Sequence, residues 1–125
     1  MTERHENLFG AIERLFHEPS RMAIMTALCG ASDGLAFTEL KEQCDLTDGN
    51  LNRHLKTLED ARAVRIRKTF VGLRPRTTVF ATPRGREEFL QYLRALEQAL
   101  KAAASAVKAE GLRPSATYVA ARARA

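Results

Sequence analysis

Amide, guanidinium, ammonium and hydroxyl side chains gather in one short stretch near the middle of the chain. In chain order they are Thr47, Asn50, Asn52, Arg53, Lys56 and Thr57. Arginine can bridge the acceptor atoms of guanine in the major groove of B-DNA, and asparagine can pair with adenine. We therefore expect Asn50, Asn52 and Arg53 to be able to contact base edges. Lys56 lies about one turn further on and is better suited to a phosphate.

A helix must position these side chains, because leucines recur along the same stretch at helical spacing. Leu51, Leu55 and Leu58 fall on one face, and Thr47 is a suitable N-cap for a helix that contains them. We expect a recognition helix over residues 47–61, with its leucines packed inward and its polar residues outward. Because any exposed helix carries polar residues, a solvated face with no partner explains this pattern equally well.

A second group of cations lies in the next segment, whose residues alternate. Val64, Ile66 and Phe70 would lie on one side of a strand, and residues 77–80 are typical of a second strand. A turn containing Gly72 and Pro75 should join the two as a hairpin. The segment holds no acid, and its cations include Arg65, Arg67, Lys68, Arg74 and Arg76. We expect residues 68–77 to form a basic wing on phosphates or in the minor groove. The alternative is a charge cluster that protects a sheet edge.

The remaining elements predict a mainly α-helical domain with a small β-hairpin, in the order of a winged helix-turn-helix. We expect helices over about residues 4–18 and from Pro19, a short strand at residues 35–36, and a helix from about Glu39 to Cys44 capped by Thr38. A final helix over 83–108 comes after Thr82. Residues 1–110 would form one domain with dimerisation helices at 4–18 and 83–108, and residues 111–125 would form a flexible basic tail.

The final helix carries an apolar seam that favours a homodimer. From Phe89 onward the seam continues through Leu93, Leu96, Leu100, Ala103 and Val107, at alternating spacings of four and three residues. A helix of this length would run about 37 Å, longer than a domain of this size easily covers. We expect a subunit interface that also includes Leu8, Ile12 and Leu15 of the first helix. The two recognition helices would then lie about 34 Å apart.

Composition bounds the function classes. The 125 residues carry a formal net charge of +5 and two cysteines in no metal-binding or redox spacing. We find no glycine-rich phosphate loop and no nucleophile beside a histidine, so we expect no enzyme, no cofactor and no metal. The N-terminus is polar, and no apolar run approaches the roughly 18 residues needed to span a bilayer. We therefore expect a cytoplasmic protein with no membrane partner.

Four runs of sequence together resemble the ArsR-like and MarR-like bacterial regulators. They are HEPSRMAIM at residues 17–25, LTDGNLNRHLKTLE at 46–59, FVGLRPRT at 70–77 and TPRG at 82–85. The second resembles the recognition helix of the subgroup described as winged-helix DNA-binding domain proteins, and the last two resemble its wing and the start of its last helix. The resemblance covers residues 8 to 100.

The resemblance implies a homodimeric, sequence-specific regulator of double-stranded DNA, and we expect a repressor that addresses a near-palindromic operator. It also bears on sensing. Metal-responsive ArsR repressors carry paired thiols before the recognition helix or acid and histidine ligands in the last helix, whereas here Cys44 stands alone. No small-molecule effector is identifiable. The main alternative function is a winged-helix module that holds another protein and never contacts DNA.

Overall fold

The computed structural model describes residues 10–111. Residues 10–16 are helical and precede α2 (Pro19–Cys29), β1 (Leu35–Ala36), α3 (Phe37–Cys44), α4 (Asp48–Asp60), β2 (Val64–Val71), β3 (Arg74–Ala81) and α5 (Pro83–Gly111). The chain divides into two compact units, Met1–Tyr92 and Leu93–Ala125. The first unit holds every element up to the start of α5, and the second holds the rest of that helix. None of the helices described is apolar and long enough to cross a bilayer.

The helix-turn-helix consists of α3 and α4, joined by a tight turn. Asp45 ends α3 in the left-handed conformation, with φ of 53°. Thr47 then caps α4, because its Oγ1 accepts a hydrogen bond from the backbone N–H of Asn50 at 3.2 Å. This bond confirms the predicted cap, and the burial of Leu51, Leu55 and Leu58 confirms the predicted amphipathic helix.

Two predicted helix boundaries differ in the structure. The predicted cap at Thr38 is wrong, because α3 begins at Phe37 and is preceded by Ala36, whose side chain makes no capping bond. The first helix ends at residue 16, and Leu8 lies outside the described residues, as does the predicted tail beyond Gly111. The short strand Leu35–Ala36 and the helix start at Pro19 are as predicted.

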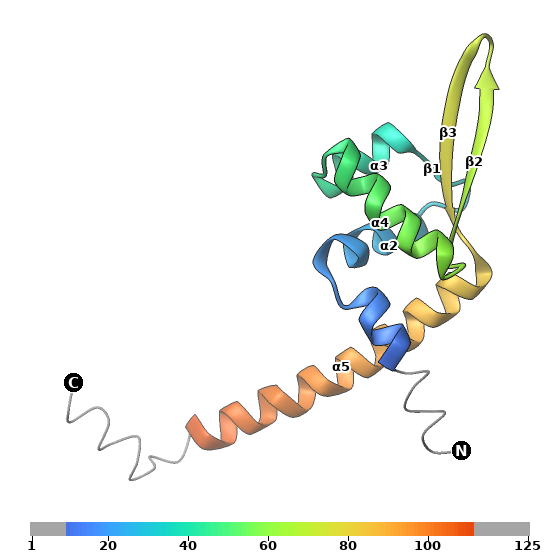
Figure 1. Cartoon of the computed structure of the whole chain (residues 1–125). Coiled ribbons are helices and arrows are strands. Elements are labelled where there is room, and N and C mark those ends of the chain that lie inside the picture. The colour runs from blue at the N-terminus through green and yellow to red at the C-terminus, as the bar shows by residue number, and fades with distance from the viewer. Residues whose placement is uncertain (1–9, 112–125) are drawn as a thin grey trace, which may run out of the picture. The chain divides into compact units, whose positions relative to one another are not determined.

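Three antiparallel strands form the sheet, in the order β1-β3-β2. Strands β2 and β3 make a long hairpin that extends past α3 and α4 (Figure 1). Its turn has only two residues, Gly72 and Leu73, because Val71 pairs with Arg74. Gly72 has φ of 65°, a conformation that glycine adopts without steric cost. The prediction of a proline-containing loop is wrong, since Pro75 lies within β3 opposite Phe70.

The start of α5 is fixed against the turn between α4 and β2. Thr82 caps α5 by accepting from the N–H of Gly85 at 2.9 Å, and its own hydroxyl donates to the carbonyl of Arg62 at 2.7 Å. A Cβ at Gly85 would collide with the backbone of Ala63, so only glycine fits there. Further along, Phe89 and Tyr92 pack against the buried Phe16, with ring centroids 5.2 and 6.0 Å away. This contact holds residues 10–16 against the domain.

Candidate nucleic-acid interface

The polar face of α4 is free of the core along its length. All six predicted residues of this stretch are exposed: Thr47, Asn50, Asn52, Arg53, Lys56 and Thr57. They divide into two rows, since positions three and four apart share a face of a helix. One row contains Asn50, Arg53 and Thr57, and the other contains Asn52 and Lys56. The two predicted asparagines therefore lie on opposite borders of the exposed face.

Two exposed hydrogen bonds within the helix link the row of Asn50, Arg53 and Thr57. An Nη2 of Arg53 donates to Oδ1 of Asn50 at 3.4 Å, and Thr57 Oγ1 donates to the carbonyl of Arg53 at 3.2 Å. The Arg53–Asn50 contact is long and exposed, so it is weak and readily exchanged for another acceptor. The guanidinium of Arg53 thus remains available to a ligand.

The row of Asn52 and Lys56 faces a groove between α4 and the hairpin. This groove, with a volume of about 760 Å³, has Asn52 and Lys56 on its helix side and Lys68 and Thr77 on its strand side. Apolar side chains and one acid complete the lining: Phe37, Leu55, Ile66 and Glu59. The groove brings a recognition-helix lysine and a wing lysine to one concave surface, which the sequence did not specify.

The predicted wing cations have different surroundings. The guanidinium carbons of Arg65 and Arg67 lie 5.4 and 5.6 Å from the ring centroid of Phe80, within the range of cation–π attraction. Arg76 forms an exposed ion pair of 3.5 Å with Glu39 of α3, so the fold brings an acid to a strand pair that holds none. Lys68 and Arg74 have no ion-pair partner among residues 10–111.

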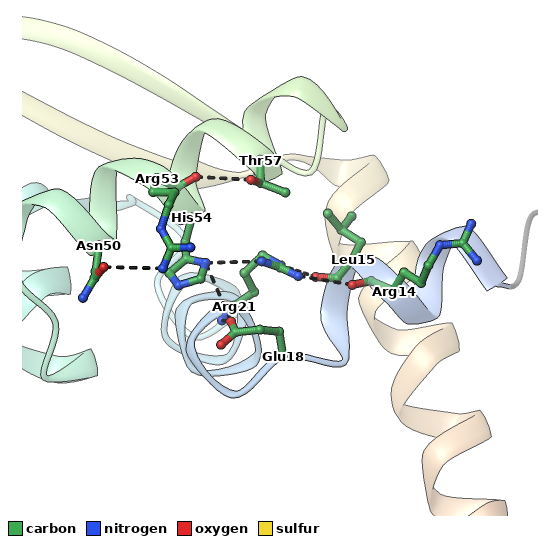
Figure 2. A network of polar contacts seen from close by, with 8 residues as sticks. All are labelled: Arg14, Leu15, Glu18, Arg21, Asn50, Arg53, His54 and Thr57. Carbon is green, nitrogen blue, oxygen red and sulfur yellow. Dashed lines mark hydrogen bonds and ion pairs between the residues drawn. The ribbon is translucent and has the colours of Figure 1, made fainter.

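The buried side of α4 carries a polar residue that the sequence pattern did not single out. His54 is the one buried charged or polar residue in the described part of the chain. Its Nδ1 lies 3.3 Å from an Nη1 of Arg21 and 3.7 Å from Oε2 of Glu18, which caps α2 through the N–H of Arg21 (Figure 2). The sequence could have indicated this position, because His54 lies three residues after Leu51 and four before Leu58 and therefore falls on the buried face of the helix.

Arg21 links this histidine to the first helix. Its Nε donates to the carbonyl of Leu15 at 2.6 Å and an Nη2 donates to the carbonyl of Arg14 at 3.2 Å (Figure 2). Carbonyls in the last turn of a helix have no partner within the helix. The guanidinium of Arg21 therefore donates to two carbonyls at the end of the helix over residues 10–16 and also contacts His54 of α4.

Two groups of this network have shifted pKa values. Burial lowers the pKa of His54; the Glu18 carboxylate opposes this, while Arg53 and Arg21 reinforce it. Burial acts to raise the pKa of Glu18, but the backbone N–H groups of Arg21 and Ser20 and the charges of His54 and Arg21 outweigh it and lower that pKa. Neutral His54 beside ionised Glu18 is thus the favoured state at neutral pH.

The predicted interface residues outside α4 and the hairpin differ in exposure. Ile12 is buried within the single chain and Leu15 is half-buried. On α5, Leu93, Leu100, Ala103 and Val107 are exposed and Leu96 is half-buried.

Cys29 and Cys44 are free and half-buried rather than fully buried, and burial raises the pKa of each thiol. Within residues 10–111 no three His, Cys, Asp or Glu side chains come together as metal ligands.

Comparison with known proteins agrees with this geometry. The model of the winged helix DNA-binding domain family matches residues 20–100. An uncharacterised protein of Methanocaldococcus jannaschii is 36% identical over 80 residues, which cover 64% of this chain and 86% of that protein.

Two solved structures share the arrangement. A transcriptional regulator homologue from Pyrococcus horikoshii OT3 is 31% identical with a TM-score of 0.67, covering 71% of this chain and 87% of its own. A MarR-family transcriptional regulator from Silicibacter pomeroyi, 18% identical over 92% of this chain and 89% of its own, has the same fold with a TM-score of 0.51. Both are described as transcriptional regulators or homologues of one. The chain belongs to the winged helix DNA-binding domain family.

Proposed function

We propose that this protein binds a specific sequence of double-stranded DNA as a homodimer and represses transcription there. Helix α4 enters the major groove, and the hairpin β2–β3 contacts the phosphate backbone or the minor groove. The observation that carries the proposal is the groove between these two elements. There Asn52 and Lys56 of α4 lie across from Lys68 of β2, so one surface offers both a base-reading side chain and charges for phosphates.

Recognition by α4 and the hairpin is divided between base contacts and phosphate contacts. Asn50, Asn52 and Arg53 contact base edges, because their amide and guanidinium groups match the hydrogen-bonding pattern of the major groove. The other proposed contacts are to phosphates, which fix the register of the protein on the duplex. They come from Thr47, Lys56, Thr57, Arg67, Lys68, Arg74 and Arg76.

The exposed apolar stripe on α5 supports the dimer. Leu100 and Val107 are 61% and 71% exposed in the single chain, and Leu93 lies on the same stripe. Leaving such side chains in water forgoes the free energy of burying them, which a second copy of α5 would supply. We propose that residues 1–110 act as one winged-helix module in each subunit. A dimer with recognition helices about 34 Å apart matches half-sites one helical turn apart, and its occupation of that DNA is the basis of repression.

Selection of bound duplexes from a random pool, at near-physiological salt, tests specific binding directly. We expect enrichment of an inverted repeat with half-sites about one turn apart, and then a gel shift on the enriched duplex. Absence of both enrichment and shift would contradict the proposal and favour a winged-helix module that binds another protein.

Sedimentation of the parent beside Leu100→Glu tests the dimer separately. We expect the parent to sediment as a dimer at micromolar concentration and the variant as a monomer. A parent that is monomeric under these conditions would contradict the dimer.

A further inference from the structure

The tip of the hairpin β2–β3 is apolar although the strands below it are basic. Leu73, in the turn, is 98% exposed, and Phe70 and Val71 are 74% and 61% exposed. Leu73 and Phe70 are thus largely open to solvent, whereas Val71 lines a shallow hollow with Thr38 and Glu39. Isolated exposed leucines are ordinary, but an apolar cluster at the end of a projecting hairpin indicates a surface that is buried on binding.

The strand register places part of this cluster on the same side as the recognition helix. Phe70 lies directly opposite Pro75, so the two share one face of the hairpin. Side chains two residues apart share a face as well, which adds Lys68 and Ile66. Both of these line the groove against α4. Phe70 and Pro75 therefore continue the α4-facing surface outward from Lys68 toward the tip.

Charge identifies the kind of partner that fits this tip. The chain has no acid between Asp60 and Glu87, and the cations in that interval are Arg62, Arg65, Arg67, Lys68, Arg74, Arg76, Arg84 and Arg86. Arg74 pairs with Val71 directly beside the turn. An apolar tip flanked by Lys68 and Arg74, which have no ion-pair partner among residues 10–111, complements a surface whose apolar walls lie between rows of anions. The minor groove of DNA, with deoxyribose walls between two rows of phosphates, is such a surface.

We propose that Leu73 and Phe70 form an apolar wedge that enters the minor groove and bends the duplex, with Lys68 and Arg74 on the flanking phosphates. This inference rests on the proposed DNA binding and adds that the tip of the hairpin enters the minor groove and bends the DNA. The cations alone would suffice for phosphate contacts, so they leave the apolar apex unexplained. The minor groove is about 6 Å wide, whereas the backbones of paired strands already lie about 4.8 Å apart between their axes. The hairpin is therefore too broad to enter as a whole, and only side chains that project from its tip can enter.

The test uses the full-length protein on its selected duplex and compares Leu73→Ala with Arg74→Ala. Leu73→Ala should weaken binding about tenfold and reduce the bend, measured by energy transfer between dyes at the duplex ends, while the salt dependence stays that of the parent. Arg74→Ala should instead reduce the salt dependence. Because Leu73 is 98% exposed, thermal unfolding of Leu73→Ala should match the parent, which excludes misfolding as the cause.

A second measurement locates the wedge in the groove. Replacing G·C by I·C under the expected position of the tip removes the guanine amino group from the minor groove and leaves the major groove unchanged. We expect tighter binding by the parent and a smaller gain for Leu73→Ala. Equal binding and bending by parent and Leu73→Ala would overturn the wedge alone. A parent that binds no duplex would overturn the proposed function together with it.

Discussion

Arg21 donates from its Nη1 to Nδ1 of His54 across 3.3 Å, and this contact joins α2 to the buried side of α4. Arginine has only donors, so Nδ1 of His54 must be unprotonated and act as the acceptor. Because the same guanidinium also satisfies carbonyls at the end of residues 10–16, the position of the recognition helix is coupled to the first helix.

Replacing Arg21 by methionine should lower the free energy of unfolding by about 2 kcal/mol, because it removes donors from two backbone carbonyls and from His54. Urea unfolding at neutral pH and fixed protein concentration measures the loss. Arg21→Lys is the matched control. It keeps the charge, but a single ammonium lacks the planar fork that reaches all three acceptors, so it should restore only part of the stability. Full restoration by lysine would contradict the proposed role of the fork.

The depressed pKa of His54 predicts that stability falls with pH below neutrality. Its usual pKa is 6.5, and the folded value lies lower. Between the two values the unfolded chain binds a proton that the folded chain does not, so this contribution is complete above about pH 6.5 and is lost as pH falls toward the folded pKa. His54→Gln keeps an acceptor for Arg21 but does not titrate.

Urea unfolding of the parent and His54→Gln from about pH 8 to 5 checks this sign, since histidines titrate in that range. The parent should lose more stability than the variant below about pH 6.5. The lowered pKa of Glu18 produces a similar loss only below its usual value of 4.5, so the two effects separate. Parallel curves for parent and variant would contradict the assignment to His54.

Replacing Arg53 by alanine should weaken binding to the selected duplex by about 1–3 kcal/mol and relax the preference at one base pair. The reason is that a bidentate arginine contact to guanine carries sequence information, whereas a phosphate contact does not. Competition titrations against single-base variants of the selected duplex give both quantities. Arg14→Ala removes an equal charge from an exposed position outside α4 and the hairpin. If the two variants lost affinity equally on every duplex, Arg53 would be acting only through its charge.

Arg74 and Arg76 should differ in their effect on the salt dependence of binding. Each phosphate contact changes the slope of log affinity against log salt concentration by about 0.9 through counterion release. Arg74→Ala should reduce the slope by that amount, whereas Arg76→Ala should reduce it less, because Glu39 already lies 3.5 Å from its guanidinium. Glu39→Gln should strengthen binding to all duplexes. A weaker affinity for Glu39→Gln would indicate that the ion pair is needed to position Arg76.

Sequence patterns correctly predicted the features of the fold that depend on interactions between residues close together in the chain. The cap at Thr47 and the buried stripe from Leu51 to Leu58 depend on positions close together in the sequence, and the structure confirms both. The start of α3 is not set in this way. Phe37, its first residue, lines the groove between α4 and the hairpin, so tertiary packing decides the boundary that Thr38 was predicted to set.

The parts of the candidate site that the sequence did not predict are contacts between residues far apart in the chain. The contacts between Arg21 and His54 and between Arg76 and Glu39 join residues 33 and 37 positions apart, and no periodicity specifies such pairs. The hairpin register likewise decided that Pro75 is a strand residue opposite Phe70 and that Leu73 lies in the turn. The charge of the wing was legible in the sequence, but the placement of its apolar tip required the register.

Two glycines that face opposite environments give a matched pair for the last prediction. A Cβ at Gly49, in the first turn of α4, would meet open space, whereas a Cβ at Gly85 would collide with the backbone of Ala63. Gly85→Ala should therefore destabilise the fold by about 3 kcal/mol, since a backbone cannot yield as a side chain does. Gly49→Ala should stabilise it by about 0.5 kcal/mol, because alanine loses less conformational freedom in a helix.

The same pair tests how closely α4 approaches DNA. The methyl group of Gly49→Ala would stand on the exposed face of α4, one residue from Asn50. If α4 lies in the major groove, this variant should bind the selected duplex more weakly although its fold is more stable, as measured by urea unfolding and gel shift on one preparation. A Gly49→Ala variant that is more stable and binds unchanged would mean that the start of α4 stands away from the DNA, and contact would then begin further along the helix, at Arg53 and Lys56.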